Sequence, residues 1–312
     1  MSKLFIIGNG FDRGHGLATS YDEFRRYLCD TYINGECVDT YIPIVPSVIV
    51  GDKGEEVCNM KEVAEFLVYI ISIAEPDGNK WSDLETSLGR LDYNEAFYML
   101  PEDLDEDGDI NFWHKVYNNE DMSSNLHKVI SHVKDLFAEW VNRTDIGNAI
   151  PKQSFISMIK DEDIFLTFNY TQTLEELYDV KKESVCHIHG KQGEEILFGH
   201  GNKKNRTEEY MRKNIGSENE LSELDNFLRK DTEYALNKHR KFFTKINYMI
   251  TEVYSIGFSF ADVDMVYMRE VCRKLSSNTI WYLNDYNSSD IPIFKAKLKE
   301  CGFKGKFKKF KV

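Results

Sequence analysis

The sequence predicts an α/β fold: a Rossmann-like, mainly parallel, doubly wound sheet with a large helical insertion. Residues 3–8, KLFIIG, form a short apolar run that leads directly into the glycine-rich stretch GNGFDRGHG. A helix is expected next, because Ser20 can act as its N-cap and Glu23 follows three residues later. Further apolar runs alternate with helical or polar segments, which is typical of a parallel sheet covered by helices on both faces.

The later strands and the insertion follow from the periodicity of apolar residues. Four further strands are expected, at DIFLTF (163–168), SVCHIH (184–189), NYMITEVYSIGF (247–258) and TIWYLN (279–284). Helical periodicity in KEVAEFLVYIISIAE and SSNLHKVISHVKDLFAEWV predicts a helical insertion over residues 38–160. The expected core therefore comprises residues 1–37 and 161–312, with a second helical segment at 207–245. The C-terminal GKFKKFKV predicts an edge strand protected by lysines.

Composition narrows the class of protein. The chain has 312 residues, of which 42% are hydrophobic and 29% charged, and this is enough to form one core with an elaboration. Its 52 acidic and 39 basic side chains give a net charge of -13, which disfavours direct binding of nucleic acid. None of the six cysteines forms a Cys-x-x-Cys pair, which argues against a zinc ribbon. With no signal peptide and no membrane span in view, we expect a cytoplasmic protein with reduced thiols and no membrane partner.

Glycines crowd the first turn. Gly8, Gly10, Gly14 and Gly16 lack side chains, so backbone N–H groups there can approach the pyrophosphate of a nucleotide. Arg13 stands where the dinucleotide fingerprint has its third glycine, so the dehydrogenase form of the motif fails. A tight turn without a ligand is the alternative.

Small polar residues follow the ends of other predicted strands. Asn169 could hold ribose hydroxyls or orient a water molecule through its amide, or it could simply cap the following helix. Ser259 lies in the strand-ending segment GFSF, and Asn284 ends the strand TIWYLN. Because the carboxyl ends of parallel strands meet at one edge of a sheet, these residues predict one shared crevice.

Two histidines stand two residues apart in a predicted strand. With a strand period of two, the rings of His187 and His189 should point to the same face. They could form a metal half-site with a nearby carboxylate, or His189 could act alone as a general base. We expect His189 to reach the crevice and His187 to serve as packing.

These motifs together resemble the bacterial abortive-infection AbiH family. The shared opening is LFIIGNGFDRGHGL-x-TSY-x-x-F, and the resemblance continues in family order along most of the chain. The later motifs are Trp81-Ser-Asp-Leu-Glu85, FNYTQTLE (168–175), HIHG (187–190), FGHGN (198–202) and GFSFADVD (257–264). The resemblance implies a role in defence against phage.

The family is in turn distantly similar to sirtuin-like NAD-consuming enzymes in the order of its motifs. This similarity implies that Asn169 and His189 are catalytic. It also implies that the first turn and the strand ends contact the nucleotide, through Gly8, Asn9, Gly10, Phe11, Thr167, Gly257, Ser259 and Asn284. Thr171 replaces an aspartate of the sirtuin pattern, and the zinc-binding cysteines are absent. Cleavage of NAD is therefore expected rather than protein deacetylation.

The predicted function is that of an antiphage effector that cleaves NAD to nicotinamide and ADP-ribose. Asn169 would position the ribose and the attacking water, His189 would act as base, and Asp12 and Glu85 would stabilise the developing cation. NAD is the substrate, no metal is expected, and control would come from homo-oligomerisation or a phage or host protein. Two alternatives stay open: a non-catalytic sensor of NAD or ADP-ribose, and a metal-dependent hydrolase or nuclease that uses His187, His189 and an aspartate.

Overall fold

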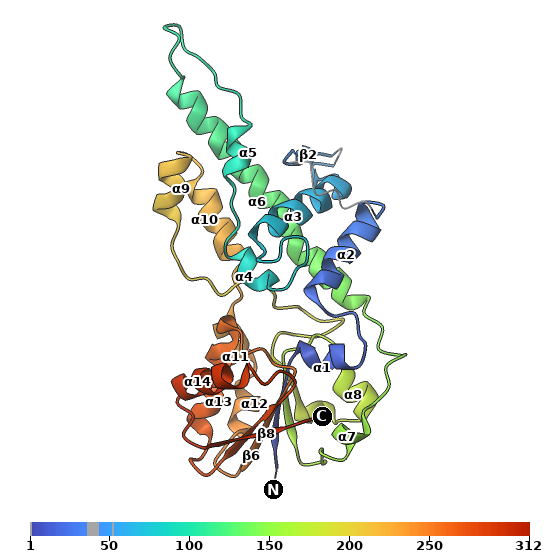
Figure 1. Ribbon diagram of the computed structural model, residues 1–312. Helices are drawn as coiled ribbons and strands as arrows, with labels where there is room; N and C mark the ends of the chain where they lie inside the picture. Colours follow the sequence, from blue (N-terminus) through green and yellow to red (C-terminus); the bar gives the residue numbers. More distant parts are fainter. Residues whose placement is uncertain (1, 36–43, 52) are drawn as a thin grey trace. The chain divides into compact units, whose positions relative to one another are not determined.

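The computed structural model describes residues 2–35, 44–51 and 53–312, and the chain divides into two compact units (Figure 1). Unit 1 comprises Met1–Ser20, Val141–Leu197 and Asp231–Val312. Unit 2 comprises Tyr21–Trp140 and Phe198–Lys230. Of the expected insertion at 38–160, the described residues up to Trp140 belong to unit 2 and the rest to unit 1. The expected helical segment at 207–245 is likewise divided, after Lys230.

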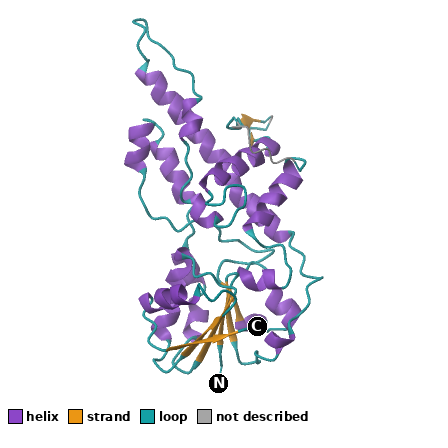
Figure 2. Ribbon diagram, viewed as in Figure 1, coloured by secondary structure: helices purple, strands orange, loops and turns teal. Residues whose placement is uncertain are grey.

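Unit 1 contains a six-stranded sheet in which every neighbouring pair of strands is parallel. The strand order is β5-β4-β1-β6-β7-β8, so the chain crosses over in both directions from the central β1. The strands are β1 (Leu4–Ile7), β4 (Ile164–Thr167), β5 (Val185–His187), β6 (Glu252–Ile256), β7 (Ile280–Asn284) and β8 (Lys306–Phe310). The predicted doubly wound, Rossmann-like α/β fold is confirmed (Figure 2).

Two hydrophobic clusters cover the two faces of this sheet. Alternate residues of β1 point to opposite faces, so Leu4 and Ile6 join one cluster and Phe5 and Ile7 the other. The first cluster includes buried residues of α11 (Thr232–Lys238), α12 (Arg240–Lys245), α13 (Met265–Lys274) and α14 (Ile291–Glu300). The second includes residues of α1 (Asn9–Gly14), α7 (Gln153–Ile156) and α8 (Thr173–Tyr178). Burial on both faces explains why the central strands are apolar throughout.

Unit 2 is mainly helical. Its helices are α2 (Tyr21–Tyr32), α3 (Met60–Ala74), α4 (Leu84–Leu88), α5 (Asn94–Tyr98), the long α6 (Phe112–Asn142), α9 (Thr207–Lys213) and α10 (Glu218–Phe227). An antiparallel hairpin joins β2 (Ile49–Val50) to β3 (Glu56–Val57). The start of α3 is fixed by Asn59, whose side chain accepts a hydrogen bond from the Lys61 N–H. Stacked rings of Phe137 and Phe198, 3.8 Å apart, bind the two segments of this unit together.

Several smaller expectations can be compared with the structure. The C-terminal run forms β8 at the edge of the sheet, with Lys306, Lys308 and Lys309 exposed, which confirms the lysine-protected edge strand. Free thiols are confirmed for Cys58, Cys186, Cys272 and Cys301. Cys29 is disulfide-bonded, so the expectation of reduced thiols is wrong at that position, and Cys37 lies outside the described residues. Among the described helices, none combines the length and apolar character needed to cross a bilayer.

Candidate active site

The carboxyl ends of β5, β4, β1, β6 and β7 lie side by side at one edge of the sheet in unit 1. The register pairs Ile7 with Thr167 and Ile256, and Thr167 with His187. This pairing brings together the segments that begin at Gly8, Phe168, Ile188 and Gly257, as the sequence predicts. Ligands of open α/β sheets bind outside such an edge, where the strand order reverses.

The glycines of the first turn serve a close contact between two loops. The Gly10 N–H donates to the Gly257 carbonyl at 2.9 Å. A Cβ atom on Gly8 would lie 2.6 Å from the Gly257 oxygen, and one on Gly10 would lie 2.7 Å from the Gly257 Cα. Gly257 itself has φ +62°, which favours glycine. Backbone packing therefore accounts for these three glycines, and the Gly10 N–H is engaged within the protein.

Asp12 is a buried carboxylate on the helix that follows this turn. Its side chain accepts a hydrogen bond from the Thr171 hydroxyl, and Thr171 in turn contacts Thr173 at 2.9 Å. The second carboxylate oxygen, Oδ1, has no hydrogen-bond partner among the described residues. Burial raises the pKa of Asp12 to about 6, although the hydrogen bond from Thr171 and the nearby polar side chains of Thr173 and Asn169 partly offset the effect. The pKa of this carboxyl group therefore lies well above that of an ordinary aspartate.

Asn169 lies beside Asp12, just beyond the end of β4. Its side chain is 6% exposed, and its Oδ1 atom has no partner among the described residues. The Asn169 N–H donates to the Thr167 hydroxyl at 3.1 Å, which fixes the backbone. The interpretation of Asn169 as a helix cap is wrong, because α8 begins at Thr173 and its N-cap position is Gln172. Asp12 and Asn169 thus present two buried polar groups with unused hydrogen-bonding capacity.

His187 is buried, as expected for a residue that packs beneath the sheet edge, and both of its ring nitrogens make polar contacts within the protein. Its Nε2 lies 2.9 Å from a Glu175 carboxylate oxygen, and its Nδ1 lies 3.2 Å from the Asn169 carbonyl. Both neighbours are acceptors, so the ring can donate to both only as an imidazolium when Glu175 is ionised. Burial alone would raise the pKa of Glu175, but the hydrogen bond and charge of His187 bring about a net lowering. His187 therefore ties the Asn169 backbone to a buried ion pair.

His189 has a different environment. Its ring is 3% exposed, and its Nε2 lies 3.4 Å from a carboxylate oxygen of Asp264. The rings of Phe168 and Tyr267 lie 5.4 and 5.5 Å away, and both belong to the first hydrophobic cluster. A small pocket lies beside His189, lined by residues that include Gly190 and Tyr234. The Asp264 carboxylate is therefore close enough to interact electrostatically with the imidazole of His189.

The expectation that both histidine rings share one face is wrong. His187 contacts Glu175 on α8, a helix that packs in the second cluster, whereas His189 contacts residues of the first cluster. The alternation of a strand does not extend to His189, because β5 ends at His187 and Gly190 turns the chain with φ +81°. The two rings therefore do not form the metal half-site considered from the sequence.

The motifs that meet at this sheet edge come from segments that lie far apart along the chain. A model of the family described as bacteriophage abortive infection AbiH matches residues 4–285. The chain belongs to the AbiH family. No curated protein and no solved structure matches it. The matched range contains every candidate site residue of this AbiH protein from Gly8 to Asn284, and family membership indicates a role in abortive infection by phage.

The remaining candidate residues of the AbiH protein have varied positions. Phe11 is buried in the second hydrophobic cluster, and Ser259 is exposed. The Asn9 side chain donates to the Thr19 carbonyl at 2.7 Å and thereby holds the loop after α1. Asn284 is half-buried at the end of β7, two strands away from β1. These residues frame the edge of the sheet but contribute little buried polar surface.

Glu85 belongs to the other unit of the AbiH protein. It lies on α4, and its carboxylate accepts a hydrogen bond from Lys230 in a buried ion pair. Both side chains are almost fully enclosed within unit 2. Glu85 therefore has a charge partner of its own.

Sequence reasoning missed several members of the cluster in the AbiH protein. The sequence marks Thr171 only as a departure from the sirtuin pattern, yet its hydroxyl donates a hydrogen bond to Asp12. Glu175 stands in the FNYTQTLE motif and Asp264 in GFSFADVD, so the family motifs did contain both. Their partners, His187 and His189, could not be assigned to them without the fold.

Proposed function

We propose that this AbiH protein cleaves NAD to nicotinamide and ADP-ribose during abortive infection. The observation that carries the proposal is the juxtaposition of Asp12 and Asn169 at the sheet edge. Both side chains are buried, and each has an oxygen atom without a partner among the described residues. An unsatisfied buried polar atom costs about 1–3 kcal/mol, so these groups favour a ligand that supplies the missing hydrogen bonds. We choose NAD as that ligand because the order of the sequence motifs resembles that of sirtuin-like enzymes.

The proposed chemistry is hydrolysis of the bond between nicotinamide and ribose. This bond breaks through an oxocarbenium-like transition state, nicotinamide leaves as a neutral molecule, and water adds to the ribose carbon and releases a proton. The ionised Asp12 carboxylate would stabilise the developing positive charge in a site of low polarity. The Asn169 amide would hold a ribose hydroxyl or the attacking water. We do not extend the proposal to Glu85, because Lys230 neutralises it.

His189 is proposed as the base that accepts the released proton. Asp264, 3.4 Å from its ring, would orient the imidazole and stabilise its charged form. His187 would act as a positioning residue, since it holds the Asn169 carbonyl and not a group that faces the substrate. No metal takes part in this scheme.

Purified protein incubated with NAD tests the proposal directly. Wild-type protein should release nicotinamide and ADP-ribose in equal amounts, and Asn169→Ala should lower the rate by at least about 100-fold, as expected for loss of one group that stabilises the transition state. Asn148→Ala is the matched control, because Asn148 is an exposed asparagine of the same unit. In phage-infected cells, NAD should fall with the wild-type and control proteins but not with Asn169→Ala. If the protein binds ADP-ribose but releases no nicotinamide, either when purified or in infected cells, the alternative of a non-catalytic nucleotide sensor is favoured.

A further inference from the structure

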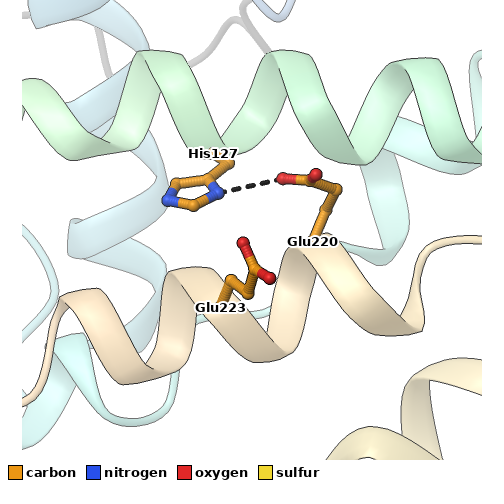
Figure 3. A group of neighbouring side chains, drawn as sticks. All are labelled: His127, Glu220 and Glu223. Atoms are coloured by element: carbon orange, nitrogen blue, oxygen red, sulfur yellow. Dashed lines mark hydrogen bonds and ion pairs between the residues drawn. The ribbon is translucent and has the colours of Figure 1, made fainter.

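We propose a binding site for a divalent transition-metal ion in unit 2, formed by His127, Glu220 and Glu223. His127 lies on α6, and the two glutamates lie on α10 (Figure 3). The His127 Nδ1 atom is 3.0 Å from a Glu220 oxygen, and the ligand atoms of all three residues lie within 4.8 Å of one another. Figure 3 shows the three side chains pointing toward one another from the two helices.

The donor set and spacing fit such an ion. Glu220 and Glu223 stand three residues apart, so both carboxylates project from one face of α10. An imidazole with two carboxylates is a ligand set that Zn²⁺ accepts, with bonds of about 2.0–2.2 Å. Tetrahedral bonds of that length place neighbouring ligand atoms about 3.3–3.6 Å apart. The 3.0 Å separation between His127 and Glu220 needs to change by only a few tenths of an ångström to meet this geometry.

The local charge also favours a cation. No lysine or arginine of the described chain forms an ion pair with Glu220 or Glu223, and the Glu223 carboxylate has no hydrogen-bond partner there. Like charges three residues apart on a helix repel each other. A hydrogen bond between His127 and Glu220 accounts for the contact between those two residues. It does not explain why the Glu223 carboxylate also lies close to both of them. A divalent ion would neutralise both carboxylates and use all three side chains.

The proposed ion would join two distant segments of the chain. His127 belongs to the segment Tyr21–Trp140 of unit 2, and the glutamates belong to Phe198–Lys230. With three protein ligands, one coordination position is left for water or another molecule. Because the ion would link these two segments, its binding should stabilise unit 2. This inference does not depend on the proposed cleavage of NAD, which is placed in unit 1.

The test uses the full chain without an affinity tag, stripped of metal by a chelator and titrated calorimetrically with ZnCl₂. Wild-type protein should bind one Zn²⁺ per chain with micromolar or tighter affinity, and its melting temperature should rise. His127→Gln and Glu223→Gln should each weaken binding by at least about 100-fold, because even supporting residues around metal ligands contribute 10- to 100-fold. His132→Gln, a partly exposed histidine of the same helix, is the matched control and should bind as the wild type does.

Substitution of Co²⁺ for Zn²⁺ identifies the ligand type. Nitrogen and oxygen ligands give visible d–d absorption without a thiolate charge-transfer band, whereas a band of that kind would assign the ion to a cysteine and overturn the proposal. Equal affinity in Glu223→Gln and wild type would also overturn it, as would the absence of stoichiometric binding to the wild type. Glu223 is exposed, so its replacement leaves the fold intact and keeps this comparison decisive.

Discussion

Replacement of Asp12 by asparagine should stabilise unit 1 at neutral pH while abolishing the proposed NAD cleavage. Burial raises the pKa of Asp12 from 3.8 to about 6, which means that the folded protein disfavours the ionised carboxylate. In the unfolded chain the same group ionises near its ordinary pKa. Asparagine has nearly the same shape, can still accept the hydrogen bond from Thr171, and carries no charge.

The size and pH range of the effect follow from the pKa difference. A rise from 3.8 to about 6 corresponds to roughly 3 kcal/mol at 1.36 kcal/mol per pKa unit. Between these pH values the folded state binds more protons than the unfolded state, so wild-type stability falls as pH rises through this window. Wild type and Asp12→Asn should therefore differ little from this cause near pH 4 and by up to about 3 kcal/mol above pH 6. For a unit of this size, that gain raises the melting temperature by roughly 6–12 °C.

Unfolding of both proteins in denaturant at pH 4.5 and pH 7.5 measures this difference. Asp161→Asn is the matched control: Asp161 is an exposed aspartate of unit 1, paired with Lys181 in solvent, and its loss should change stability by less than about 0.5 kcal/mol. The nicotinamide assay on the same samples should show that the more stable Asp12→Asn protein is inactive. A variant that is no more stable than wild type at pH 7.5, or equally stabilised at both pH values, would refute the assignment of a strained buried charge.

Two further predictions concern the buried ion pairs. His187→Gln should destabilise unit 1 by about 2–4 kcal/mol, because the Glu175 carboxylate then lies buried without its cation. Unfolding in urea measures this loss. Unchanged stability would show that the pair is not ionised. Lys230→Met should destabilise unit 2 by about 3–5 kcal/mol by leaving Glu85 unpaired. The double variant Lys230→Met/Glu85→Gln should recover much of the lost stability in thermal unfolding. If the stability losses of the two single variants simply add in the double variant, the pairing of Lys230 with Glu85 is contradicted.

The sheet could be predicted from sequence because each strand has a local signal. Leu4–Ile7 is a run of four buried apolar residues that ends at a glycine, and Ile164–Thr167 is a similar run that ends at polar residues. Parallel strands buried on both faces require this composition. The lysines of Lys306–Phe310 predict an edge position, because charged side chains protect an edge strand from pairing with another chain.

The site was predictable only in part, because its contacts join distant residues. The contact of Asp12 with Thr171 depends on the pairing of β1 with β4, and no local pattern specifies that pairing. The expectation that His187 and His189 share one face fails because the strand period of two was applied beyond His187, where the strand ends. Glu85 stands out in the sequence only because of its motif, since its partner Lys230 is 145 residues away along the chain.

The ionised Asp12 carboxylate at the sheet edge lowers the stability of unit 1 near neutral pH, and this is itself an argument for function. Asp12 is a buried carboxylate whose ionisation the fold disfavours, whereas Glu175 nearby is paired with His187. Apolar residues of similar volume commonly replace buried ionic groups with no loss of stability, so packing does not require these side chains. Nor does the turn require them, since Gly8, Gly10 and Gly257 already account for its geometry. Groups that weaken a fold and serve no structural need are expected where binding or chemistry requires them, which is why a more stable but inactive Asp12→Asn protein is the most informative outcome.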